Sequence, residues 1–144
     1  MTTVNDVLRP GSTALLTTQG PDGPRTRPVI VHDDPAGEAG VLAVLTKPDT
    51  RKIADVAATP RATVCGTTAD GYYALEARTE VIDDPAVVGL AMARFLGMDP
   101  AQAPAPEPGA APAVAAIRLR FDSGKKWTVH SDKPFDNDVE DIEI

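Results

Sequence analysis

The chain has 144 residues, of which 42% are apolar, and its net charge is −7 at pH 7. This length suits one domain with a core of its own, and no run approaches the roughly 18 apolar residues that a membrane span needs. The negative charge argues against a nucleic-acid partner, because phosphate backbones require clustered cations. The N-terminus has no basic region followed by an apolar run, so we expect no signal peptide and a cytoplasmic protein.

The cysteine and histidine content excludes several kinds of chemistry. Cys65 is the only cysteine, and its apolar, strand-like surroundings predict a buried structural thiol. His32 and His130 are the only histidines, and their isolation argues against a histidine-based metal site or a Ser/His triad. We therefore expect no metal.

Six or seven short strands are expected from alternating or continuous apolar runs bounded by turn residues. They are 12–20, 25–33, 41–46, 61–68, 71–82 and 114–121, with 125–131 as the seventh. Alternation in the second strand places Arg25, Arg27, Val29 and Val31 on one face. Pro28 within this strand indicates an edge position. Short turns between the strands favour antiparallel pairing that closes into a small barrel.

Two helices are expected at 50–58 and 83–97. Thr59 and Pro60 end the first helix. Asp84 can cap the second helix, and Gly97 suits the position just past its end. We expect a single domain over 1–144, with a Pro/Ala-rich linker at 99–113 and an acidic C-terminal tail at 132–144. This tail holds six carboxylates and one lysine, and we expect it to pack against another part of the protein, for which a partner subunit is one candidate.

The start of the first helix is unusual, because Arg51 and Lys52 place two cations where the helix dipole is already positive. A bound anion would remove this conflict, since free backbone N–H groups at a helix start bind phosphate. Thr50 could join the site, as could Thr46 and Lys47 from the end of the preceding strand. The alternative is that both cations are solvated surface charges.

Arg27 lies between Arg25 and Val29 on a strand face whose following residues, Val29 and Val31, are apolar. An arginine in such a place needs an anionic partner. That partner is either a ligand at the start of the helix or a carboxylate of the chain, for which Glu76 and Glu80 are the candidates.

Three stretches, at 14–31, 41–64 and 72–85, together resemble the pyridoxamine 5'-phosphate oxidase-like superfamily, and are most similar to its general stress protein type. The resemblance covers about half of the chain. It implies a mainly β fold with two or three helices, a six- to seven-stranded antiparallel split β-barrel that binds FMN. It also implies a homodimer with the cofactor site at the subunit interface.

The resemblance also assigns residues. The phosphate of FMN would be held by Arg27, Thr50, Arg51 and Lys52. The isoalloxazine ring would be lined by Val29, Ile30, Leu45, Thr46 and Lys47. Trp127 of the second subunit would touch the cofactor. Alternatively, this tryptophan packs in the barrel or in the dimer interface.

Departures from the family pattern argue against true pyridoxamine phosphate oxidase activity. His32 stands where those enzymes have a lysine, and Tyr72 stands where they have a glutamine. The C-terminal Arg-x-His motif that they use for substrate is absent from the sequence. We can name no catalytic acid or base, so the catalytic residues stay unassigned.

The sequence leaves several functions open. The first is an FMN-dependent oxidoreductase that transfers hydride or electrons to or from a small molecule. The second is a reductase of the same fold that uses the deazaflavin coenzyme F-420, which the Ala-, Pro-, Gly- and Asp-rich composition of a high-GC genome favours. The third is a non-catalytic flavin-binding stress protein. Haem ranks last, because neither histidine has a recognisable haem setting.

Overall fold

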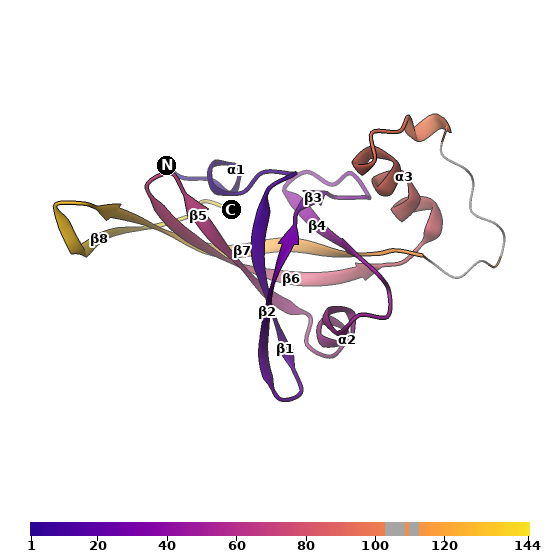
Figure 1. Cartoon of the computed structure of the whole chain (residues 1–144), viewed down its shortest axis with the longest axis horizontal. Coiled ribbons are helices and arrows are strands. Elements are labelled where there is room, and N and C mark those ends of the chain that lie inside the picture. Colours follow the sequence, from indigo (N-terminus) through magenta and orange to yellow (C-terminus); the bar gives the residue numbers. More distant parts are fainter. Residues whose placement is uncertain (103–108, 110–112) are drawn as a thin grey trace.

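Eight strands form one antiparallel sheet that curls around an apolar core (Figure 1). The computed structural model describes residues 1–102, 109 and 113–144. Its elements are α1 (Val4–Val7), β1 (Thr13–Gly20), β2 (Gly23–Ile30), β3 (His32–Asp33), β4 (Val41–Thr46), α2 (Arg51–Ala58), β5 (Arg61–Thr68), β6 (Gly71–Ile82), α3 (Pro85–Phe95), the 3-10 turn η1 (Pro100–Gln102), β7 (Ala115–His130) and β8 (Lys133–Asp141).

The sheet order is β2-β1-β5-β6-β7-β4-β3, and β8 pairs with β7 outside this path. The sheet curls enough to bring β2 into contact with β4, although these two strands are not neighbours in its order. The barrel is therefore split between β2 and β4. The expected mainly β, antiparallel split barrel is confirmed.

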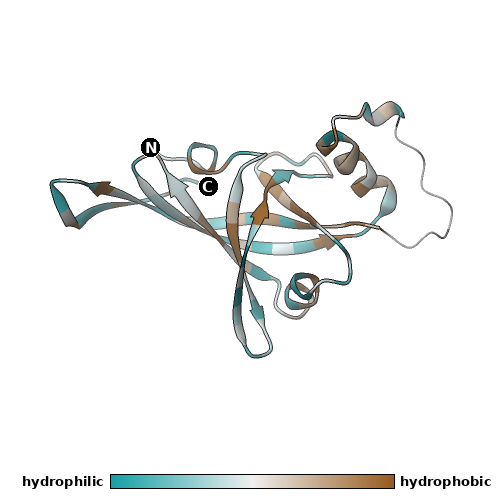
Figure 2. Ribbon diagram, viewed as in Figure 1, coloured by the Kyte–Doolittle hydropathy of each residue, from teal (hydrophilic) through white to brown (hydrophobic). Residues whose placement is uncertain are grey.

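The core lies on the concave side of the sheet, where alternate residues of the strands meet. Leu16, Val64, Leu75 and Leu119 are fully buried there. Brown apolar segments lie on β4, on the ends of β6 and β7 near α3, and on parts of α3, whereas the far end of the β1–β2 hairpin is teal (Figure 2). Alternation along β1 and β6 thus accounts for part of the core, whereas β4 and the first part of β7 are buried at consecutive residues.

Helices α2 and α3 cover different parts of this barrel. Helix α2 contacts β1 and β6 and buries Val56. Helix α3 packs Val88 against Ala43 and Ala116 of β4 and β7. Its expected cap is confirmed, because Asp84 accepts a 3.0 Å hydrogen bond from the Ala86 N–H. None of the helices in the described part of the chain is long and apolar enough to cross a bilayer.

The predicted strand at 25–33 is broken at Val31 into β2 and β3. Val31 donates its N–H to the Ser12 carbonyl (2.9 Å) and accepts from the Gly11 N–H (2.7 Å). The chain turns a corner there and leaves β1. Pro28 does lie in an edge strand, because β2 ends the sheet order.

The C-terminal part differs most from the sequence prediction. The strands expected at 114–121 and 125–131 form the single strand β7. Asp122 is the extra residue of a bulge opposite Glu76 and Ala77, so the polar stretch between the two expected strands does not turn. The acidic tail continues as β8, which pairs with β7 of its own chain. Of the linker at 99–113, the structure shows η1, and 103–108 and 110–112 lie outside the described residues.

Cys65 is partly exposed, and the prediction of a buried thiol is wrong. It pairs with Leu15 of β1 and Ala74 of β6, and Leu15 is itself 43% exposed. Val64, the next residue on the opposite face, is the buried one. The thiol therefore lies on the outer face of the sheet.

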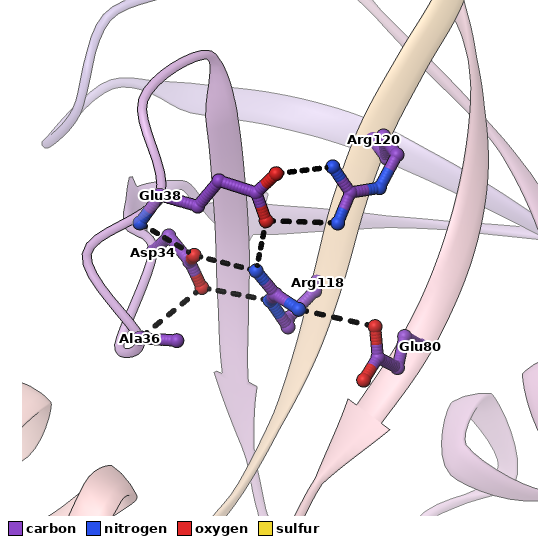
Figure 3. A network of polar contacts seen from close by, with 6 residues as sticks. All are labelled: Asp34, Ala36, Glu38, Glu80, Arg118 and Arg120. Carbon is purple, nitrogen blue, oxygen red and sulfur yellow. Dashed lines mark hydrogen bonds and ion pairs between the residues drawn. The ribbon is translucent and has the colours of Figure 1, made fainter.

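A buried ion pair fixes the loop before β4 to the sheet (Figure 3). Arg118 on β7 donates hydrogen bonds from Nε (2.9 Å) and Nη2 (2.7 Å) to the two carboxylate oxygens of Asp34. It also reaches Glu80 at 3.1 Å and Glu38 at 2.7 Å. Arg120 holds Glu38 from the other side at 2.6 Å. Sequence patterns did not predict this network, because its members are far apart in the chain.

The network lowers the pKa values of its carboxylates Asp34 and Glu38. Burial acts to raise the pKa of Asp34, but hydrogen bonds from Arg118 and from the Glu38 and Ala36 N–H groups outweigh it and lower that pKa. Hydrogen bonds from Arg120 and then Arg118 lower the pKa of Glu38 to about 2. Both carboxylates therefore favour the folded state while they are ionised.

We predict that Arg118→Gln lowers the free energy of unfolding by about 3 kcal/mol, because it leaves the buried Asp34 carboxylate without its cation. Urea denaturation at pH 7 measures this. The matched control Arg120→Gln, at an exposed arginine of the same network, should change stability much less. A larger loss in the control would contradict the prediction.

The same variant should flatten the acid dependence of stability. Carboxylates with a lowered pKa stabilise the fold above their ordinary pKa, and this contribution disappears as the pH falls through the folded value. The wild-type protein should thus lose stability between pH 4.5 and about 2 more steeply than Arg118→Gln does.

Candidate functional site

The start of α2 leaves its first-turn N–H groups without a side-chain cap. Thr50 is the N-cap residue, but its hydroxyl makes no capping hydrogen bond. Instead it donates to the Lys47 carbonyl (3.2 Å) and lies 3.3 Å from the Thr46 hydroxyl. The helix start therefore keeps backbone donors for another group.

A cleft of about 370 Å³ opens beside this helix start, at the split between β2 and β4 and under α3. It gathers six of the ten residues that the sequence assigned to a cofactor. These are Val29, Ile30, Leu45, Thr46, Lys47 and Lys52. The other lining residues are Pro28, His32, Val44, Met92, Phe95 and Val114.

The cleft is cationic at one end and carries an imidazole at the other. Lys47 follows the last residue of β4, whereas His32 pairs with Ala43 in the same strand. Ala43 and Lys47 are four residues apart, which corresponds to about 13 Å along an extended strand. Burial, and then the charge of Arg27, lowers the pKa of Lys52. A ligand in this cleft would meet apolar walls between an ammonium end and an imidazole end.

Four of the predicted residues do not line the cleft: Arg27, Thr50, Arg51 and Trp127. Thr50 and Arg51 lie at the start of α2 beside it, and the Arg51 side chain is exposed. Arg27 is directed into the barrel wall, where its Nη1 donates to the Thr18 hydroxyl at 2.7 Å.

The carboxylate near Arg27 is Asp55 of α2, with 3.6 Å between Nη2 and Oδ2. The two candidates from the sequence have other partners. Glu76 accepts a hydrogen bond from the Thr63 hydroxyl, and Glu80 pairs with Arg118. The prediction that Arg27 pairs with Glu76 or Glu80 is therefore wrong. It overlooked that the second turn of α2 faces the β1–β2 hairpin.

Trp127 lies far from the cleft of its own chain. It stacks on Tyr72 with 5.7 Å between ring centroids, and it pairs with Val139 of β8. The cleft is near Val114, which precedes the other end of β7. Twelve residues of extended strand from Ala115 to Trp127 correspond to about 40 Å. In Figure 1 the β7–β8 hairpin extends away from α2 and α3.

Sequence reasoning missed the contribution of α3 to the cleft. Met92 and Phe95 line it, and Phe95 packs edge-to-face on the His32 ring with 4.9 Å between centroids. Apolar residues run around most of α3, so no single face could be chosen from the sequence. His32 attracted notice only because the related oxidases have a lysine there.

A larger hollow of about 900 Å³ lies between the N-terminal segment and the loop before β4. None of the predicted cofactor residues lines it. Four of its six charged lining residues are carboxylates, which disfavour an anionic ligand. Asp34, Glu38 and Arg120 are held in the network around Arg118. The cleft beside α2 is therefore the better candidate site, because its two ammonium groups have no such partner in the described part of the chain.

The curled antiparallel sheet and the cleft at its split define a split-barrel protein. A family model described as pyridoxamine 5'-phosphate oxidase matches residues 2–128. The chain therefore belongs to the pyridoxamine 5'-phosphate oxidase family, which confirms the resemblance seen in the sequence. No curated protein sequence matches the chain.

Solved structures share the fold at low sequence identity. An F420 reductase is 22% identical with a TM-score of 0.58, covering 85% of this chain and 94% of that one. General stress protein 26 from Bacillus anthracis str. Sterne is 19% identical with a TM-score of 0.57, covering 79% and 82%. A pyridoxamine 5'-phosphate oxidase-related, FMN binding protein from Nostoc punctiforme is 15% identical with a TM-score of 0.54, covering 95% and 90%.

We predict that His32 titrates below its ordinary pKa of 6.5, because burial lowers the pKa more strongly than the charge of Asp33 raises it. Phe95→Ala should expose the ring and raise the pKa. NMR titration of the imidazole protons measures both, with His32→Gln to assign the signal and His130 as the internal control. A pKa at or above 6.5 in the wild-type protein would contradict this explanation.

Proposed function

We propose that the protein is an FMN-binding oxidoreductase that acts on a small molecule in the cytoplasm. The observation that carries this proposal is the cleft itself, which joins an apolar slot to a cationic helix start. An isoalloxazine ring needs apolar walls, and a phosphate needs backbone donors and cations. Both requirements are met within one cavity.

The residues present fit FMN in type and in space. A volume of about 370 Å³ falls within the roughly 300–1,000 Å³ of small-molecule sites. Val29, Ile30 and Leu45 would face the ring, and Lys47 and Lys52 would face the phosphate beside the free N–H groups of α2. Bound FMN would supply hydride or single-electron transfer, which no side chain of the protein can provide.

His32 and Phe95 would bound the end of the site opposite the phosphate. A neutral imidazole there can donate or accept one hydrogen bond at its exposed nitrogen. By family resemblance the true oxidases have a lysine near the phosphate at this position, whereas His32 would lie at the other end of this cleft. The substrate is therefore expected to differ from pyridoxamine phosphate.

The deazaflavin coenzyme F-420 is the second candidate for the same cleft. The similarity to an F420 reductase over most of both chains favours it. A flavin-binding stress protein without a substrate is the third candidate, and the similarity to a general stress protein supports it. Turnover with a reduced nicotinamide would separate the enzymatic functions from the non-catalytic one.

We also propose a homodimer in which Trp127 of one subunit approaches the cleft of the other. The β7–β8 hairpin and the start of β6 form an arm in which Tyr72, Trp127 and Val139 lie side by side across three strands. Tyr72, Val139 and the nearby Phe135 are exposed. Exposed apolar groups of this kind mark interaction surfaces. The arm is also too far from its own cleft to complete it.

The first prediction here concerns the cofactor. The wild-type protein should bind FMN, and Lys52→Gln should weaken this binding at least about tenfold, because a charge-assisted hydrogen bond to phosphate is lost. Quenching of FMN fluorescence measures the affinity. Arg9→Gln, at an exposed arginine that lines neither the cleft nor the β7–β8 hairpin, is the control and should leave it unchanged. Tighter binding of F-420 than of FMN would select the second candidate.

The second prediction tests the shared site by complementation. Trp127→Ala and Lys52→Gln should each weaken FMN binding. Equal amounts of the two variants, mixed under conditions that exchange subunits, should restore wild-type affinity in about one quarter of the clefts. This follows because each mixed dimer contains one cleft with both residues intact. No recovery after proven subunit exchange would rule out a site built from two subunits.

A further inference from the structure

We infer that Arg27 is a structural strut whose buried counter-ion is Asp55, and that the cleft lysines Lys47 and Lys52, rather than Arg27, supply side-chain cations for the ligand's phosphate. The inference departs from the role that family resemblance gives to Arg27. Its part about phosphate rests on the proposed function, whereas its part about the strut concerns the fold alone.

The Arg27 guanidinium is already occupied inside the protein. Its Nη1 donates to the Thr18 hydroxyl at 2.7 Å, to the Arg25 carbonyl at 3.0 Å and to the Leu16 carbonyl at 3.5 Å. Its Nη2 lies 3.6 Å from Asp55 Oδ2. These groups come from β1, β2 and α2, so one side chain connects three elements. Arg27 does not belong to the lining of the cleft.

The burial of Asp55 means that moving Arg27 away from it would lower the stability of the fold. The Asp55 side chain is 3% exposed, and its Oδ2 accepts a 2.7 Å hydrogen bond from the Thr18 hydroxyl. The other nearby cation is Arg25, whose Nε is 3.9 Å away. If Arg27 turned toward a ligand, the carboxylate would keep one hydroxyl and one distant guanidinium. A buried charge that loses its partner destabilises the fold strongly.

Lys52 and Lys47 are in the opposite situation. Both line the cleft, and neither has an ion-pair partner within 4 Å in the described part of the chain. Lys52 is the second residue of α2, two residues after its N-cap Thr50. A phosphate there would satisfy both ammonium groups without breaking any contact. The ion pair between Arg27 and Asp55 therefore holds α2 in place, and the two lysines are available to bind the phosphate.

The test compares FMN with riboflavin, which lacks the phosphate, in Arg27→Gln, Asp55→Asn and Lys52→Gln. For Lys52→Gln we expect the preference for FMN over riboflavin to fall at least about tenfold with little change in Tm. For Arg27→Gln and Asp55→Asn we expect Tm to fall by at least about 5 °C, with the preference changed by less than about threefold. The variant that combines Arg27→Gln with Asp55→Asn should lose less stability than the sum of the two single losses, because both changes break the same interaction.

The contrary results are equally specific. A tenfold loss of FMN preference in Arg27→Gln without a loss of Tm would make Arg27 a phosphate ligand. Additive losses of stability in the variant that combines Arg27→Gln with Asp55→Asn would show that the two side chains are not coupled, and would rule out the strut. Arg27→Lys replaces Arg27→Gln if that variant does not fold. If the wild-type protein binds neither flavin, the proposed function fails. The Tm measurements and the double-mutant comparison then still test the strut.

Discussion

The contact of Asp55 with Thr18 and Arg27 is the constraint on which the candidate site depends. It joins the second turn of α2 to the inner side of the β1–β2 hairpin. A helix of eight residues is too short to be stable alone. Its direction must therefore come from tertiary contacts, which are Val56 in the core and this buried charge. Together they aim the start of α2 at the split between β2 and β4.

The cleft follows from this placement and from the curl of the sheet. Because β2 and β4 approach without pairing, a gap remains whose walls are strand residues on both sides. Helix α3 closes one side with Met92 and Phe95. The apolar walls thus come from the barrel and from α3, whereas the cations come from the turn between β4 and α2 and from the first turn of α2. Two parts of the chain with different local chemistry combine to make one elongated site.

Local patterns predicted much of this, and long-range contacts account for the rest. The alternation of β2, the cap of α3 and the cations at the start of α2 are all properties of short stretches, and the structure shows each of them. The partner of Arg27, the network around Arg118 and the role of Phe95 depend on residues that meet only after folding. The strand β8 was missed because its acidic sequence lacks apolar alternation, and it is held by pairing with β7. A strand that is held only by backbone pairing with its neighbour shows no hydrophobic periodicity in the sequence.

The position of the single tryptophan has a consequence for spectroscopy. Trp127 is the only tryptophan and stacks on Tyr72 in the arm, about 40 Å of strand away from the cleft of its own chain. Its intrinsic emission therefore reports on the arm and is insensitive to local changes around α2. In a lone subunit, a ligand could fill the cleft with little effect on this signal. Any strong response of the emission to a ligand would instead indicate that another molecule's cleft had come close.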